Sequence, residues 1–197
     1  MKSKIKQMRV ALLLAVVVLF TITAAPSAKA VEAEESIYGP YDSFIELYNA
    51  YMDAVEAGDQ NLIDELVEIG HTSLQAEIEM SESQAIQPRY DAIAAEWAAR
   101  FPEFFSYGYF EKRDNGWTLS MAPYTKHIWS DQEKSDGWQA TYGKFKDNTH
   151  WDNTEIMKEQ FYCHARLGYS FAQTEWNLEP WRTQMDPFTC NDPLTGS

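Results

Sequence analysis

The spacing of the hydrophobic residues changes once along this chain, near residue 103, and this change constrains the fold more than any other feature. Between residues 41 and 103, apolar side chains such as Phe44, Leu47 and Tyr51 recur every three or four positions, which is the period of an amphipathic helix. From about residue 105, apolar and polar side chains alternate on both sides of Asn115-Gly116, a pattern typical of a β-hairpin. We therefore expect an α+β protein, with amphipathic helices followed by a small mixed domain.

Two or three helices are expected in the first region. Gly58 should end one helix, and Asp59 can cap the next. Gly70 is a candidate interruption, and Pro88 opens a third helical pattern that ends before Pro102. The acidic outer faces of these helices are interpreted as a solvated surface, with a dedicated cation- or partner-binding face as the alternative.

The second region begins with the hairpin, which we place at residues 105–123. A helix is predicted at residues 131–145, and another begins at Asn153 or Thr154, both of which are capping residues. Residues 174–182 are predicted to form an extended segment that ends with the turn at Pro180. The tail that follows is rich in turn residues.

The first thirty residues have the pattern of a secretory signal peptide that is cleaved after Ala30. An apolar run at residues 11–25 is too short for a comfortable membrane span, and Ala28-Lys29-Ala30 is a small-x-small cleavage site. The predicted organisation is therefore a signal peptide at 1–30, an acidic linker at 31–40, an acidic helical region at 41–103 and an α+β domain at 104–197. The basic residues that precede the apolar run are Lys2, Lys4, Lys6 and Arg9.

Charge excludes several classes of partner. Of the 16 Lys and Arg and 30 Asp and Glu residues, residues 31–197 hold 11 basic and 30 acidic ones, a net charge of −19. Sequence-independent binding to nucleic acid depends on neutralising phosphates and is therefore not expected. Adsorption to anionic lipid is disfavoured for the same reason, and we expect no stable membrane insertion of the mature chain. Aromatic residues make up 14% of the chain, which argues against an acidic disordered protein.

Cys163 and Cys190 are the only two cysteines. An even count in an exported protein indicates a disulfide, and two cysteines allow one intramolecular pairing. Such a bridge would fasten the last loop of the chain to the helix that carries Cys163. The alternative is a Cys163 nucleophile with a nearby histidine.

Three motifs resemble an uncharacterised family of secreted bacterial proteins, which is known as a domain of unknown function. These motifs are Gln160-Phe161-Tyr162-Cys163-His164, then Trp176-Asn177-Leu178-Glu179-Pro180-Trp181-Arg182, and finally Cys190-Asn191. The resemblance extends over about residues 107–192, and Thr183 departs from it where the family tends to have proline. It implies an exported, disulfide-containing domain and supplies no mechanism.

The Trp-Asn-Leu-Glu-Pro-Trp-Arg segment is the candidate binding surface. In a strand, alternate side chains point to opposite faces, so Trp176 and Leu178 would pack inward. One interpretation is a core strand that ties Glu179 or Arg182 into a buried ion pair. The other is a surface that binds a sugar ring or a peptide, formed by Trp176, Asn177, Glu179, Trp181 and Arg182.

His164 is the candidate for chemistry, with Glu179 as its carboxylate partner. The simpler interpretation is a core histidine whose ring is hydrogen-bonded within the protein, and the alternative is a general base. A zinc site assembled from His164, His150 or His127 with a carboxylate has no support from spacing, because the sequence contains no HExxH or HxH motif. It also contains no GxSxG, P-loop or GxGxxG motif, so we expect neither a metal nor a cofactor.

Three hypotheses about function remain. The first is a secreted, non-enzymatic protein that binds a protein or carbohydrate partner at or outside the cell envelope. The second is a secreted hydrolase that uses His164 and a carboxylate such as Glu179. The hydrolase requires a solvent-accessible His164 at the mouth of a pocket that also holds Glu179 or Arg182. A third possibility makes residues 41–103 a pro-region or an intramolecular inhibitor.

Overall fold

A computed structural model of the chain describes residues 36–84, 93–124, 129–168 and 175–191. The predicted signal peptide and His127 lie outside these ranges. Residues 36–40, the described part of the predicted linker, form a turn, and the hydroxyl of Tyr38 there donates to Glu77 Oε1 at 3.2 Å.

The first two helices follow their local signals closely. Helix α2, Phe44–Ala57, begins after Ser43, which accepts a hydrogen bond from the Glu46 amide at 3.3 Å, and it ends at Gly58 with φ 68°. Asp59 then caps α3, Gln60–Gln84, by accepting from the Leu62 amide at 3.2 Å. These caps supply partners for amides that a helix end leaves unpaired.

Gly70 does not interrupt α3, contrary to its candidate role as a break. A Cβ atom at this position would lie 2.8 Å from Cγ of Pro187 and 2.9 Å from Cζ of Phe188. The missing side chain therefore lets the C-terminal loop approach α3 closely, which outweighs the cost of a glycine inside a helix, about 1 kcal/mol.

The sheet contains three antiparallel strands in the order β1-β2-β3: β1, Phe105–Lys112; β2, Trp117–Pro123; and β3, Trp176–Leu178. The predicted hairpin is confirmed, with Lys112 opposite Trp117. Its turn centres on residues 114–115, since Arg113 and Gly116 exchange backbone hydrogen bonds of 2.8 and 3.3 Å. Gly116 instead leaves room for the ring of Trp181, which a Cβ there would overlap.

Three further helices complete the α+β fold: α4, Ala94–Phe104; α5, Asp131–Phe145; and α6, Thr154–Leu167. Helix α5 has the predicted bounds, and a capping box of Ser130 and Glu133 explains its start. At the start of α6, Asn153 makes no side-chain cap; its Nδ2 donates to the carbonyl of Arg182 at 2.7 Å.

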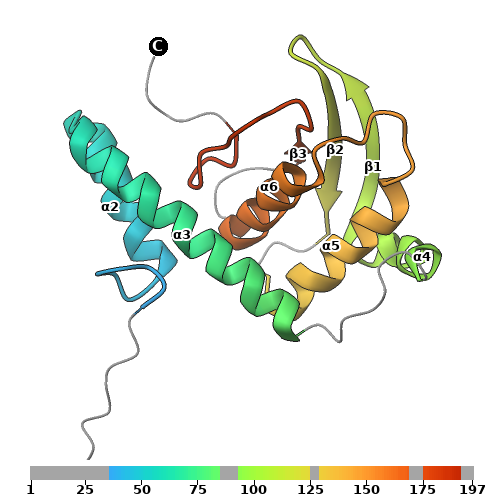
Figure 1. Cartoon of the computed structure of the whole chain (residues 1–197), viewed down its shortest axis with the longest axis horizontal. Coiled ribbons are helices and arrows are strands. Elements are labelled where there is room, and N and C mark those ends of the chain that lie inside the picture. The colour runs from blue at the N-terminus through green and yellow to red at the C-terminus, as the bar shows by residue number, and fades with distance from the viewer. Residues whose placement is uncertain (1–35, 85–92, 125–128, 169–174, 192–197) are drawn as a thin grey trace, which may run out of the picture. The chain divides into compact units, whose positions relative to one another are not determined.

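Helices α5 and α6 lie between the sheet and α3, and α2 packs on α3 (Figure 1). Aromatic rings fill the space between α6 and the sheet, with Phe161 5.4 Å from Trp176 and 6.1 Å from Phe105 between ring centroids. The helices of the predicted 41–103 region and the predicted 104–197 domain belong to one compact unit, Glu35–Ser197. The predicted boundary falls next to the junction between α4 and β1, and the division of the chain into these two regions stays a prediction.

Candidate functional site

Trp176, the first residue of the candidate surface, belongs to the core. It is 2% exposed, and its ring centroid lies 5.0 Å from that of Trp129. Leu178 is fully buried as well, so both residues point inward as the strand period predicts. Trp176 therefore anchors β3 and does not reach a ligand.

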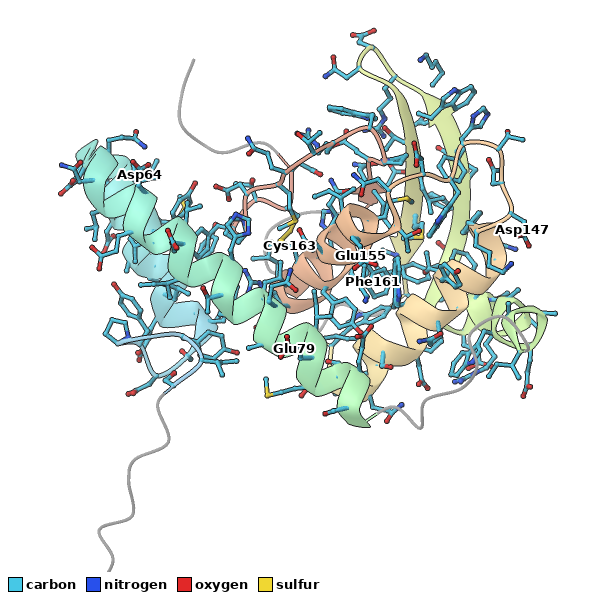
Figure 2. The ribbon with its side chains drawn as sticks, in the orientation of Figure 1. Asp64, Glu79, Asp147, Glu155, Phe161 and Cys163 are labelled. Atoms are coloured by element: carbon cyan, nitrogen blue, oxygen red, sulfur yellow. A yellow bond between two sulfur atoms is a disulfide. The ribbon has the colours of Figure 1, made fainter. Side chains whose placement is uncertain are left out.

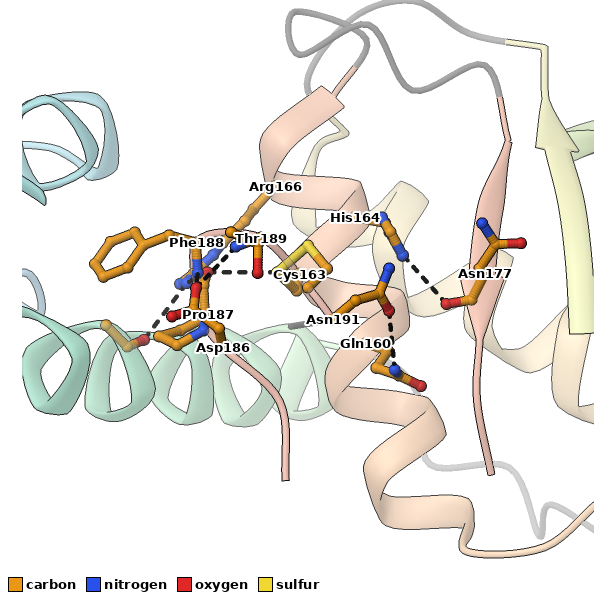
Figure 3. Close-up of a disulfide and its surroundings, with 12 residues drawn as sticks. Gln160, Cys163, His164, Arg166, Asn177, Asp186, Pro187, Phe188, Thr189 and Asn191 are labelled. Atoms are coloured by element: carbon orange, nitrogen blue, oxygen red, sulfur yellow. Dashed lines mark hydrogen bonds between the residues drawn. A yellow bond between two sulfur atoms is a disulfide. The ribbon is translucent and has the colours of Figure 1, made fainter. Parts of the chain in front are cut away.

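His164 lies in the same core. It is 1% exposed, its ring stacks on Trp176 with centroids 5.7 Å apart, and Nε2 is 3.4 Å from the carbonyl oxygen of Asn177 (Figure 3). A general base has to come within hydrogen-bond reach of its substrate. The buried position of His164 does not provide the accessible imidazole that the hydrolase hypothesis requires.

Of the extended segment predicted at residues 174–182, residue 174 lies outside the described ranges, and the strand ends at Leu178. Beyond it the chain turns, and the Arg182 amide donates to the Glu179 carbonyl at 3.1 Å. Pro180 contributes to this turn, because it has no amide hydrogen to continue a ladder. The predicted alternation of faces is therefore lost after β3, and the remaining candidate residues separate into two groups.

The first group belongs to the solvent-facing side of the sheet. Asn177 pairs with Ser120 across β2 and β3, and Tyr107 and Tyr109 on β1 are 43% and 48% exposed, with ring centroids 5.7 Å apart. We call this surface the tyrosine platform and define it as Tyr107, Tyr109, Glu111, Arg113, Glu175 and Asn177, together with Ser120, which is fully buried beneath them.

Hydrogen bonds hold the polar side chains of the tyrosine platform in place. Asn177 Oδ1 accepts from Arg113 Nη2 at 3.0 Å and from Ser120 Oγ at 2.9 Å. Arg113 also pairs with Glu111, and its hydrogen bond, followed by that of Ser120, lowers the pKa of Glu111. The Tyr107 hydroxyl donates to Glu175 Oε1 at 3.1 Å, and this bond raises the pKa of Tyr107.

Sequence reasoning identified Asn177 but not the rest of the platform as a surface. The signal was present in the alternation of Tyr107, Tyr109 and Glu111, which places the three on one face of a strand. Only the pairing of β2 with β3 shows that Asn177 lies on this same face.

The second group lies where β3 turns toward the C-terminal loop. The guanidinium of Arg182 pairs with the carboxylate of Glu179 and lies 4.5 Å from the Trp181 ring centroid. Trp181 is half-buried against the hairpin turn at Gly116. Arg182 therefore covers part of the Trp181 ring, one of the candidate binding residues.

Residues from all three motifs of the family resemblance contact one another in this second group. The Glu179 amide donates to Gln160 Oε1 at 2.7 Å. Gln160 Nε2 donates to Asn191 Oδ1 at 3.2 Å (Figure 3). Glu179 is only 8% exposed. These bonds join α6, the turn after β3 and the last described residue.

The predicted disulfide is confirmed. Cys163 and Cys190 are fully buried and joined, with Cα atoms 5.5 Å apart. The loop before Cys190 is further held by Asp186, whose Oδ1 accepts from the amides of Phe188 and Thr189 at 2.9 and 3.0 Å. We refer to residues 182–191 as the stapled loop.

A buried ion network connects the stapled loop with three helices. Glu77 on α3 lies 2.9 Å from Lys134 Nζ on α5 and 3.6 Å from Arg166 Nη1 on α6. Arg166 also donates to the carbonyl of Pro187 at 2.6 Å, and burial lowers its pKa. Burial and the neighbouring Glu77 raise the pKa of Tyr38 to about 12.

A cavity of about 320 Å³ opens between the N-terminal half of α3 and the stapled loop. Its wall combines apolar side chains with carboxylates, amides, an imidazole and the Arg182 guanidinium. The residues that line it from α3 are Gln60, Ile63, Asp64, Val67 and His71, and those from the loop are Arg182, Gln184, Met185, Asp186 and Asn191.

Neither a metal centre nor a membrane span is found among the described residues. Within residues 36–84, 93–124, 129–168 and 175–191, no group of three or more His, Cys, Asp or Glu side chains could hold a metal ion. In the same part of the chain, no helix has the length and apolar character needed to cross a membrane.

Comparison with known proteins identifies one family. Residues 109–192 match the family described as "Protein of unknown function (DUF2599)". The match runs from β1 through β3 and the stapled loop, and it confirms the resemblance to a domain of unknown function. No curated protein and no solved structure matches the chain.

Proposed function

We propose that this protein is exported and acts at or outside the cell envelope as a non-catalytic binding protein, with the tyrosine platform as its carbohydrate-binding surface. Export is supported by the sequence pattern of residues 1–30 and by the disulfide Cys163–Cys190, since disulfides persist in oxidising compartments. The observation that carries the binding role is the pair of exposed tyrosine rings beside polar side chains that are already hydrogen-bonded to each other.

The chemistry of the platform suits a sugar. An aromatic ring offers an apolar face to the C–H side of a sugar ring and keeps a polar tip. Arg113, Glu111 and Asn177 supply donors and acceptors for hydroxyl groups, and their mutual bonds reduce the entropy lost on binding. The seven residues are also fewer than the roughly 20–30 that each side of a standard protein interface uses, which favours a small ligand.

A matched pair of variants tests this proposal. Tyr109→Phe keeps the ring, and Tyr109→Ala removes it from an exposed position where loss of folding is not expected. Binding of the exported protein to an array of neutral oligosaccharides, followed by calorimetry on the best probe, should show about tenfold weaker affinity for the alanine variant. The phenylalanine variant should bind like the wild type. The proposal fails if no oligosaccharide binds, or if both variants retain full affinity.

A further inference from the structure

We infer that the cavity between α3 and the stapled loop accepts a lysine or arginine side chain from a basic polypeptide partner. This site is separate from the tyrosine platform, and neither depends on the other. The inference combines the shape of the cavity, the chemistry of its wall and the charge of the two helices beside it.

The floor of the cavity suits an aliphatic chain. Ile63 and Met185 are 5% and 4% exposed, and Val67, one turn after Ile63 on α3, is half-buried. Lysine and arginine bury their methylene stems against such surfaces while their charged ends stay in a polar setting. A volume of about 320 Å³ is at the lower end of the range for ligand pockets, so it fits one side chain and not a folded segment.

The wall carries acceptors for a cationic end group. Asp64 stands on α3 near its N-terminal end (Figure 2), and Gln60 Nε2 fixes its carboxylate with a 2.7 Å hydrogen bond to Oδ1. Asp186 adds a second, buried carboxylate, which also accepts from two loop amides and from the Tyr51 hydroxyl and contributes mainly its charge. The cation in the lining, Arg182, is already paired with Glu179, so the wall retains a negative charge.

The helices beside the cavity add long-range attraction. Residues 36–84 contain eleven Asp and Glu residues and no Lys or Arg. Two of the carboxylates, Glu77 and Glu82, pair with Lys134 and Lys158, and the other nine are exposed. Such a surface speeds association with a cationic partner and repels nucleic acid and anionic lipid.

A polypeptide fits better than a small cation. Leu62 on α3, one residue before Ile63, is 38% exposed, and Ile45 on α2 is 42% exposed. Exposed apolar side chains on these two helices offer contact to the rest of a polypeptide, which a lone amine would not use. The described residues also provide no cluster for a metal ion.

The test uses fluorescein-labelled hexalysine as the probe, with fully acetylated hexalysine as its uncharged match. Anisotropy titrations of the whole exported protein compare the wild type with three variants at exposed positions. Asp64→Asn and Asp53→Asn remove the same charge, but only Asp64 lines the cavity. Gln184→Trp fills the cavity without changing charge.

We expect hexalysine to bind and its acetylated form not to bind. Asp64→Asn and Gln184→Trp should each weaken binding by about tenfold, as for an anchor residue. Asp53→Asn should weaken it by about twofold or less, and less still as salt rises. Unchanged unfolding temperatures would confirm that all three variants fold.

Three outcomes would overturn the inference: no binding of hexalysine, equal effects of the two aspartate variants, or wild-type affinity in Gln184→Trp. Each would show that the cavity does not anchor a basic side chain. The second would show that hexalysine binds only through diffuse electrostatic attraction to the acidic helices. None of them affects oligosaccharide binding, which is measured on Tyr109 variants, so the two proposals fail separately.

Discussion

At the scale of single residues, Glu77 has the largest consequence for stability. Its carboxylate is 4% exposed and serves two buried cations, Lys134 and Arg166. Removing one partner of a buried ion pair leaves an uncompensated charge. The two cations come from different helices, so one side chain joins α3 to α5 and α6.

Glu77→Gln should therefore lower the free energy of unfolding by about 3–5 kcal/mol, measured by urea titration at neutral pH. Glu79→Gln is the matched control, because Glu79 lies two residues away on the same helix and is exposed. It should change stability by less than about 0.5 kcal/mol. Similar losses in the two variants would contradict the role assigned to Glu77.

Tyr38 makes a prediction about alkaline pH. Its pKa rises from the usual 10.0 to about 12, first through burial and then through Glu77. A raised pKa in the folded state means that folding stabilises the protonated hydroxyl, fully below pH 10 and progressively less as pH rises toward 12. Relative to Tyr38→Phe, the wild type should lose stability across this window, as chemical denaturation at each pH would show. Parallel curves for the two proteins would contradict the prediction.

At the scale of elements, the crossing of α4 and α5 depends on a glycine. A Cβ atom on Gly143 would lie 2.5 Å from the carbonyl oxygen of Ala94 and 3.0 Å from the amide nitrogen of Ala98. Both neighbours are backbone atoms, which cannot rotate away as a side chain can. The distance between the two helices is therefore fixed by the absence of a side chain.

Gly143→Ala should destabilise the protein by about 1–2 kcal/mol, because the steric cost exceeds the gain in helix propensity. Gln132→Ala on the exposed face of the same helix should change stability by less than about 0.5 kcal/mol. Thermal unfolding followed by circular dichroism would measure both. A more stable Gly143→Ala variant would mean that α4 can shift without cost.

At the scale of the whole molecule, the disulfide joins the end of the chain to its centre. It closes a loop between positions separated by 27 residues, and through Pro187 and Phe188 that loop contacts Arg166 and α3. Opening the bridge should therefore loosen the cavity wall as well as the loop itself.

The double variant Cys163→Ala, Cys190→Ala should lose about 3–4 kcal/mol of stability, the chain-entropy value for a loop of this length. Urea unfolding of the wild type with and without reductant provides the comparison. The double variant should be insensitive to reductant, and hydrogen exchange should rise first in residues 182–191. A wild type that is equally stable under both conditions would contradict this account.

Local signals in the sequence were sufficient for most elements. The ends of α2 and the starts of α3 and α5 follow from Ser43, Gly58, Asp59 and the Ser130 capping box, because caps act within one helical turn. The hairpin followed from the alternation on both sides of Asn115-Gly116, although its turn centres one residue earlier, on 114–115. The disulfide needed only the cysteine count and the expected compartment, since two cysteines have one possible pairing.

The sequence by itself thus determined the α+β class, the order of the elements and the disulfide, all of which depend on residues close in sequence or on counting. Only the tertiary structure decided that Gly70 continues α3 and that Trp176 and His164 are buried. It also placed Asn177 beside Arg113 and set α3 against the stapled loop to form the cavity. These features depend on contacts between segments far apart in the chain, and the spacing of residues along one segment carries no information about the surface that packs against it.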